Sequence, residues 1–240
     1  MLPYELSTPL FSDYMVKDRF IVLPRGKSIE YTAQGPLDFP DSTIIVKNFS
    51  YINVQGQKVV IETRLLVKDP IDHNWKVMNY LWNTEQTDAV KHIRGSKLAI
   101  TLVDNSGNKH TTNYMVPNTN DCKRCHNNAS KLMPIGPKAR NLNFVRTGDS
   151  VNQLTRWSSL GLLKNMPDLK NISQLPVWTD RENTVLKNVP ELIWTSIVHT
   201  VIRKVVTHLI QGYFSIMKRT NRHIWVWIKH LYLPEEGQVA

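Results

Sequence analysis

Apolar and polar residues alternate in short runs from residue 19 to residue 115. A period of two, with many β-branched and aromatic residues, is typical of strands that bury one face. Gly56, the pair Asp69 and Pro70, and residues 104–107 supply turns between the runs. The regular spacing favours a β-sandwich or a jelly-roll-like domain over residues 1–117. The runs that we expect to form strands are residues 19–23, 43–51, 59–67, 75–82, 98–103 and 110–114.

The pattern changes after residue 117. Residues 134–143 are rich in proline and glycine, which predicts a loop. Asp149 or Ser150 is suited to cap a helix, because the apolar residues that follow recur at helical spacing. Those residues are Leu154, Trp157, Leu160 and Leu163. The expected fold class is therefore α+β, in which a small helical and loop-rich segment over residues 118–178 follows the β-rich domain.

The composition, with 41% hydrophobic and 21% charged residues, is that of an ordinary globular protein. No stretch stays apolar over the length that a bilayer requires, and we do not expect membrane association. Residues 1–5 have neither the basic nor the apolar region of an export signal.

The formal net charge is +10, and much of the excess lies near the C-terminus. Residues 192–234 contain no acidic residue and six basic ones, namely Arg203, Lys204, Lys218, Arg219, Arg222 and Lys229. This segment has no zinc ligands, glycine-rich loop or aromatic sheet pattern of a nucleic-acid module. We therefore expect solvated basic residues and no nucleic-acid partner.

The two cysteines of the chain belong to the motif Cys122-Lys123-Arg124-Cys125-His126. Two residues between the thiols allow both sulfurs to reach the vinyl groups of one porphyrin, and the adjoining imidazole then falls beneath the iron. The motif predicts one covalent haem c. Cys122 and Cys125 would tether it, and His126 would be the proximal iron ligand.

Zinc binding and dithiol redox chemistry are the alternatives for this motif. A structural zinc ion requires four ligands, usually in two pairs, and the chain has no second cysteine pair. A thioredoxin-like dithiol begins a helix directly after a buried strand, whereas residues 116–121 predict a polar turn. Both alternatives are weaker than haem.

Four further residues are candidates for contact with the haem. Lys138 and Arg140 are suited to pair with the propionates, although simple exposure to solvent explains them equally well. Met166 precedes a proline and is far enough from His126 to reach the opposite haem face, which makes it the expected sixth ligand. Met133 is the alternative. A histidine or an open position would leave both methionines without this role.

The β region offers no catalytic pattern. Asp41, Glu62, Arg64, Glu85 and Asp88 lie near predicted strand ends, without a nucleophile elbow, a metal-binding histidine pair or a phosphate loop. Glu62 and Arg64 stand two apart on one strand and share a face, where a local ion pair explains both. We expect an electron-transfer protein rather than an enzyme.

Several strings of residues resemble the bacterial two-haem c-type cytochromes, a family long known only as conserved hypothetical proteins. The strings are residues 4–14, 62–66, 82–89, 113–114, 117–120, 122–126 and 134–143, and the likeness reaches residue 178. The resemblance implies an exported, periplasmic protein with a β-rich region before the first haem and a second CxxCH after it. It implies electron transfer with a redox partner protein, without identifying that partner or any substrate.

The chain departs from that family in lacking an export signal and the second CxxCH. Thioether bonds form outside the bacterial inner membrane, so this chain without a signal is expected to stay cytoplasmic and free of haem. In a shifted reading frame, the third base of each codon joins the first two bases of the next. Over residues 191–202, synonymous codons permit this frame to encode Ala-Tyr-Leu-Asp-Ile-Asn-Cys-Ala-His-Cys-His, which contains a second CxxCH. We infer a frameshift near residues 181–185 that removed the second haem site. Residues 179–240 are then an out-of-frame tail, poorly structured or an isolated helix.

Two alternatives remain open at this point. If the present frame is genuine, the apolar residues between 192 and 210 form an amphipathic helix with basic residues, suited to a membrane surface or a partner. The chain is then a β-sandwich binding or interaction module that no longer holds haem.

Overall fold

The structure of the chain is a computed structural model that describes residues 1–177, except for residues 11, 13, 105 and 129–130. The end of the expected haem segment at residue 178, the out-of-frame tail and the amphipathic helix lie outside the described residues. They stay predictions. Within the described part, no helix has the length and apolar composition needed to cross a bilayer.

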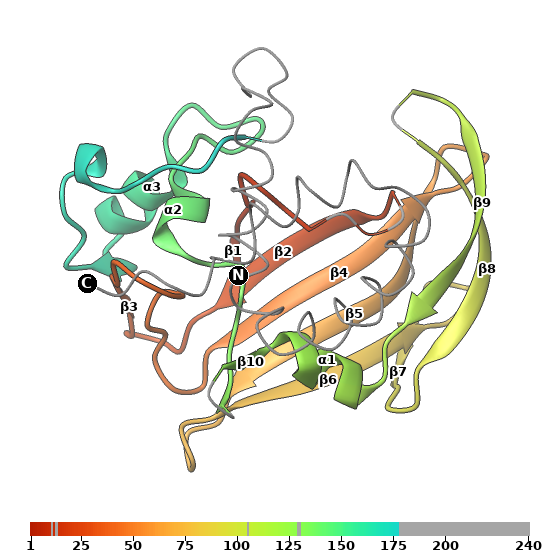
Figure 1. Cartoon of the computed structure of the whole chain (residues 1–240), viewed down its shortest axis with the longest axis horizontal. Helices are drawn as coiled ribbons and strands as arrows, with labels where there is room; N and C mark the ends of the chain where they lie inside the picture. Colours follow the sequence, from red (N-terminus) through yellow and green to blue (C-terminus); the bar gives the residue numbers. More distant parts are fainter. Residues whose placement is uncertain (11, 13, 105, 129–130, 178–240) are drawn as a thin grey trace, which may run out of the picture. The chain divides into compact units, whose positions relative to one another are not determined.

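Strands make up most of the structure before residue 117, as the alternating pattern predicts (Figure 1). The main sheet has six antiparallel strands in the order β1-β2-β4-β5-β6-β7. This order is a meander, which differs from the jelly-roll alternative, but the β-rich first part of an α+β fold is confirmed. The bounds in that order are Leu2–Pro3, Val16–Val22, Ile44–Ile52, Lys58–Lys68, Trp75–Trp82 and Ala89–Lys91.

One face of the main sheet carries two neighbouring cross-strand rows of opposite polarity. Side chains on a strand alternate between faces, so positions two apart point the same way. The first row, called the apolar row, consists of Ile21, Ile45, Leu66 and Val77. The second, called the polar row, lies two residues away from the first on each strand and consists of Arg19, Lys47, Arg64 and Asn79.

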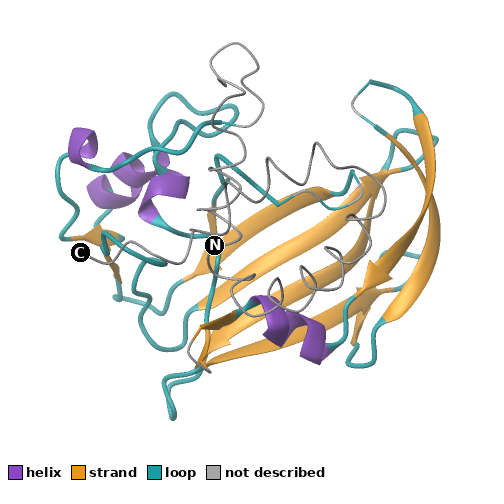
Figure 2. Ribbon diagram, viewed as in Figure 1, coloured by secondary structure: helices purple, strands orange, loops and turns teal. Residues whose placement is uncertain are grey.

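The apolar row belongs to a core that the chain after residue 138 completes. Leu142, Leu154 and Trp157 are almost completely buried in a cluster that includes Ile21 and Ile45. Figure 2 shows the helices of this segment gathered beside one end of the sheet. Its elements are α2 (Ala139–Leu142), α3 (Gln153–Ser159), β12 (Leu163–Lys164), which pairs in parallel with β3 (Ile29–Glu30), and the 3-10 helix η1 (Leu169–Asn171).

Helix α3 is shorter than its apolar spacing predicts. Asn152 caps it by accepting a hydrogen bond from the Leu154 N–H at 2.9 Å, so the expected cap at Asp149 or Ser150 is wrong. Gly161, with a φ of 68°, reverses the chain after the helix, and Leu163 therefore lies in β12. The expected loop over residues 134–143 likewise contains the single turn of α2.

A separate hairpin of β8 (Ser96–Val103) and β9 (Lys109–Val116) builds a second core with the main sheet. Leu102 of the hairpin is fully buried in the cluster that contains Phe49 and Ile61 of the sheet. Phe49 lies two residues beyond Lys47 on β4. The polar row therefore separates the two cores.

Candidate functional site

The Cys122–His126 motif lies on α1 (Thr119–Cys125) and its C-cap, and this short helix packs against β6 (Figure 1). The Asn118 side chain accepts hydrogen bonds from the N–H groups of Asn120 and Asp121 at 2.8 and 3.0 Å. The Asp121 carboxylate accepts one from the Asn118 N–H at 3.1 Å. This capping box starts a helix that is too short to be stable alone. The expected polar turn over residues 116–121 is thus wrong for residues 119–121, which are helical.

Gly95 fixes where this helix begins. Its φ is 72°, and a Cβ at this position would lie 2.9 Å from both the Asn118 nitrogen and the Val116 oxygen. The Thr119 N–H also donates to the Ile93 oxygen at 3.4 Å. The connection between β7 and β8 therefore holds the start of α1 through backbone contacts.

The two thiols stand one helical turn apart and differ in exposure. Cys122 is 8% exposed, whereas Cys125 is exposed. Burial raises the pKa of the Cys122 thiol, and the charge of Arg64 opposes this shift only in part. A dithiol redox motif needs a lowered pKa, because the thiolate is the nucleophile. Although the motif does lie on a helix that follows a strand, Cys122 is unsuited to disulfide exchange.

His126 closes the C-terminal end of α1, and the backbone fixes its ring. The His126 N–H donates to the Cys122 oxygen at 3.0 Å, and the Met133 N–H donates to the His126 oxygen at 2.7 Å. The ring Nδ1 lies 2.9 Å from the Met133 carbonyl oxygen. A carbonyl only accepts, so Nδ1 carries the proton and the lone pair of Nε2 stays available. Burial lowers the pKa of His126, which favours the neutral ring.

A buried network of hydrogen-bonded side chains from β5 and β9 lies close to the motif. The Tyr114 hydroxyl donates to Glu62 Oε1 at 2.5 Å, and Arg64 Nε donates to the same oxygen at 3.1 Å. The ion pair predicted between Glu62 and Arg64 is confirmed. Burial, followed by the Glu62 charge, raises the pKa of Tyr114 above its ordinary value. Helix α1 packs against β6, which pairs with the β5 strand of Glu62 and Arg64, so the network lies near the motif.

Five side chains of the described structure keep buried polar atoms without a hydrogen-bond partner, namely those of Ser50, Glu62, Asn79, His92 and Ser96. Two of them belong to the network and the polar row: Glu62 with its Oε2 and Asn79 with both amide atoms. Glu62 is fully buried and Asn79 is 6% exposed. Buried polar atoms in proteins are nearly always hydrogen bonded, so each exception calls for an explanation.

The donor set fits a porphyrin better than a bare metal ion. Within residues 1–177, apart from the gaps given above, no three His, Cys, Asp or Glu side chains gather to hold a metal. Structural zinc requires four such ligands. A haem brings four nitrogen ligands of its own, so the protein needs to supply only an axial ligand and tethers. Nε2 of His126 and the thiols of Cys122 and Cys125 are the groups suited to those roles.

The two methionines predicted as alternatives for the sixth ligand have different surroundings. Met133 follows the small hairpin of β10 (Asn127–Asn128) and β11 (Lys131–Leu132), and its backbone is bonded to His126. Met166 packs against the core that contains the apolar row. Hydrogen bonds thus join the Met133 backbone to His126, whereas Met166 lies against the first core.

The predicted propionate contacts lie together on α2. Lys138 is the N-cap of that helix and Arg140 its second residue. Burial lowers the pKa of Lys138, and the Arg140 charge adds to the shift. The charges of Lys47 and Arg64, in the polar row, add to the lowering of the His126 pKa.

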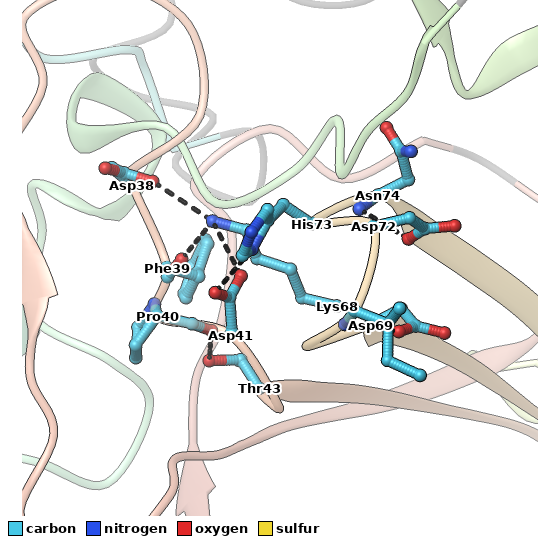
Figure 3. Close-up of polar contacts among 11 residues, drawn as sticks. Asp38, Phe39, Pro40, Asp41, Thr43, Lys68, Asp69, Asp72, His73 and Asn74 are labelled. Atoms are coloured by element: carbon cyan, nitrogen blue, oxygen red, sulfur yellow. Dashed lines mark hydrogen bonds and ion pairs between the residues drawn. The ribbon is translucent and has the colours of Figure 1, made fainter.

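A second cluster of charged residues surrounds Lys68 at the end of β5 (Figure 3). Lys68 Nζ donates to the Phe39 oxygen at 2.5 Å and lies 3.5 Å from Asp38 Oδ1 and 3.9 Å from Asp41 Oδ1. Asp41 Oδ2 also lies 2.7 Å from His73 Nδ1. Charges here are matched by partners, so this cluster fastens a loop to the sheet, as expected for a strand-edge charge such as Asp41.

The residues of the polar row that sequence reasoning did not single out are Arg19, Lys47 and Asn79. Lys47 stands between Ile45 and Phe49, which point to the same buried face of the sheet. A charged residue in the apolar phase of an alternating strand is the signal that could have identified it. Its neighbours across the strands follow only from the register, which the sequence does not state.

Comparison of the chain with known proteins found no matching family model, no similar curated protein and no similar solved structure. The resemblance to two-haem cytochromes therefore stays a prediction. What the site can do has to be argued from the motif and from the geometry around it.

Proposed function

We propose that this chain is a c-type cytochrome that binds one haem covalently and transfers electrons. The observation that carries the proposal is the orientation of His126, which ends the motif with Nδ1 bonded to the Met133 carbonyl. Histidines that ligate metals commonly donate their second ring N–H to such an oxygen, which fixes the tautomer and raises the basicity of the ligating nitrogen. The ring is therefore neutral and held in place, and Nε2 has a lone pair available, as an axial ligand requires.

Each residue of the motif has a separate task in this proposal. The thiols of Cys122 and Cys125 tether the porphyrin as thioethers, and the helix holds them one turn apart. The bound haem supplies the one-electron couple of its iron.

The proposed sixth ligand is Met166. Met133 is the weaker candidate, because its backbone is bonded to Nδ1, on the side of the ring that faces away from the iron. In the oxidised protein, Met166→Ala should remove the near-infrared band that arises from sulfur-to-iron charge transfer, and Met133→Ala should retain it. The reverse result would assign the ligand to Met133, and loss in neither variant would assign it to another group.

The family resemblance extends the proposal to location and history. The protein would act in the periplasm with a redox partner protein, residues 118–178 would form the haem segment beside a β-sandwich-like domain, and a second haem would be lost through the frameshift. Sequencing the codons of residues 180–202 tests the last point. A clean reading of the present frame, with stop codons in the shifted one, would contradict it.

Covalent attachment is the decisive test of the proposed function. The chain with a grafted, cleavable export signal is produced together with the cytochrome c maturation machinery. We expect a haem band that survives denaturation and a pyridine haemochrome spectrum typical of two thioether bonds. Cys122→Ala and Cys125→Ala should each shift that spectrum to the one-thioether position, and His126→Ala should prevent stable incorporation. Apoprotein with two titratable thiols from the matured preparation would refute the proposal.

The alternative function is a β-rich binding or interaction module without haem. This alternative is favoured by the composition of the two core clusters. Neither cluster contains Cys122, Cys125 or His126. The same experiment separates the two functions, because a folded protein that never acquires haem is the outcome expected of such a module.

A further inference from the structure

The polar row places three cationic side chains next to one another. Arg19, Lys47 and Arg64 are side by side on three adjacent strands of one sheet face. Arg19 is 7% exposed, and the Arg64 side chain is 27% exposed. Like charges placed next to one another at such burial repel strongly, because water screens them poorly.

The described residues neutralise these cations only in part. Glu62 pairs with Arg64 and is shared with Tyr114. Lys47 lies 4.6 Å from the centre of the Phe49 ring, and no carboxylate of the described structure lies within ion-pair distance of its ammonium. Arg19 donates to the Lys17 carbonyl oxygen at 3.2 Å.

The electrostatics of Lys47 express this imbalance. Burial lowers its pKa well below the ordinary value, and the charges of Arg19, Arg64 and Lys17 add to the shift. The charge of Glu62 opposes this lowering of the Lys47 pKa. An anion bound at the row would reverse the imbalance.

Asn79 gives an independent indication of a missing ligand. It continues the row on β6, is 6% exposed, and has no hydrogen-bond partner for either amide atom in the described structure. Helix α1 packs against the same strand. A carboxylate at the row could accept from the Asn79 amide as well as from the cations.

We propose that Arg19, Lys47, Arg64 and Asn79 form the binding site for the propionate carboxylates of the haem. The inference rests on the proposed function, because the ligand is the haem that the motif tethers. Helix α1, whose C-cap is His126, packs against β6, the strand that carries Asn79, so the row lies beside the axial ligand. Two propionates would place two negative charges among the three cations and so supply the negative charge that the row lacks by itself.

Lys47→Met provides the test, because it removes the charge and keeps the length of the side chain. Lys97→Met is the matched control, since Lys97 is an exposed lysine on β8 and its loss changes the net charge equally. Lys138→Met tests the earlier assignment of the propionates to α2. All three variants and the parent chain are matured as above, and their midpoint potentials are measured.

We expect Lys47→Met to retain covalent haem and to have a more negative midpoint potential than the parent. The unpaired propionate charge then stabilises ferric iron. Lys97→Met should leave the potential unchanged. In the haem-free protein, Lys47→Met should raise the melting temperature, because it removes a buried ammonium from a cluster of like charges. The same substitution should raise it less, or lower it, when haem is bound.

Each result decides the matter. If the parent acquires no covalent haem, the proposed function fails, and the propionate site fails with it. If the parent acquires haem but Lys47→Met has the potential of the parent, or if only Lys138→Met shifts it, the function stands and the polar row is not the propionate site. An equal change of melting temperature in both forms would also overturn the inference.

Discussion

The apolar row and the polar row occupy equivalent positions on the same strands, yet they are completed in different ways. Ile21 and Ile45 of the apolar row are buried under α2 and α3, within a single core. In the polar row, the buried Asn79 side chain has no hydrogen-bond partner in the described structure, and of the three cations only Arg64 forms an ion pair there. The protein alone satisfies the first row and leaves the second incomplete.

This difference separates the residues that hold the fold from those that we assign to function. Apolar contacts gain free energy wherever they exclude water, so truncating them should cost stability under all conditions. Buried charges without partners cost free energy until a ligand neutralises them. Along one strand, truncation of an apolar-row side chain should therefore lower the stability of the haem-free protein, and removal of a polar-row cation should raise it.

The largest effect should come from Ile45→Ala in the apolar row. Ile45 is 4% exposed, and deletion of a buried aliphatic side chain leaves a cavity that typically costs about 2–5 kcal/mol. Urea denaturation of the haem-free protein measures the change in the free energy of unfolding. Val46→Ala is the control, because its side chain is on the opposite, half-buried face and should cost less. Equal losses would mean that the apolar row is not the principal contact of the sheet.

Tyr114→Phe should have the next largest effect, since it tests the network that supports the polar row. Glu62 would lose the donor at 2.5 Å while staying buried, and a hydrogen bond to a charged group is worth about 1.5–3 kcal/mol. Tyr51→Phe removes the same hydroxyl from a residue that only packs against the second core. A loss no greater than that of the Tyr51 variant would show that the Glu62 carboxylate finds another donor.

Asn118→Ala should destabilise the protein by about 1 kcal/mol, as the loss of a helix N-cap usually does. This substitution removes the acceptor for two N–H groups at the start of α1, which covers part of the strand that ends the polar row. Hydrogen exchange should show faster exchange over residues 119–126. Asn120→Ala, at an exposed position inside the same helix, serves as the comparison. Equal exchange in both variants would argue against the capping box.

The smallest effect concerns Asp104, in the hairpin turn and outside both rows. A hydrogen bond from His110 and further bonds from Asn108 and Ser106 lower the pKa of Asp104 to about 2. The folded state therefore favours the ionised carboxylate. Its stabilising contribution is present above the ordinary pKa near 3.8 and is lost as the pH falls toward 2. Asp104→Asn should be less stable than the parent at neutral pH, and the difference should shrink across this window. A difference independent of pH would contradict the assignment.

The strands were predictable because alternation follows directly from burial on one face. The run from Trp75 to Trp82 agrees with β6 at both ends. The start of α1 was not predictable, because it depends on the approach of Gly95 to Asn118 from another part of the chain. The extent of α3 was misjudged because the spacing of Leu160 and Leu163 continued the pattern beyond Gly161, where the backbone turns.

The candidate site was predictable to the same uneven degree. Cys122, Cys125 and His126 lie within five residues, so the prediction of haem attachment follows from their spacing alone. The polar row depends on the register of four strands, and no short window of sequence shows that Arg19 and Asn79 belong together. Lys138 and Arg140 were chosen as fixed cations that follow the motif in sequence, and their contact with the propionates stays a prediction.

The paired hydrogen bonds between His126 and Met133 also bear on the order of events during folding. They join residues seven positions apart, across a hairpin, and contacts of such short range form early and fast. The polar row forms only when strands from distant parts of the chain have paired. The orientation of the imidazole is thus fixed while the strands of the sheet are still pairing. A tethered haem would then bind its axial ligand before the cations of the polar row come together.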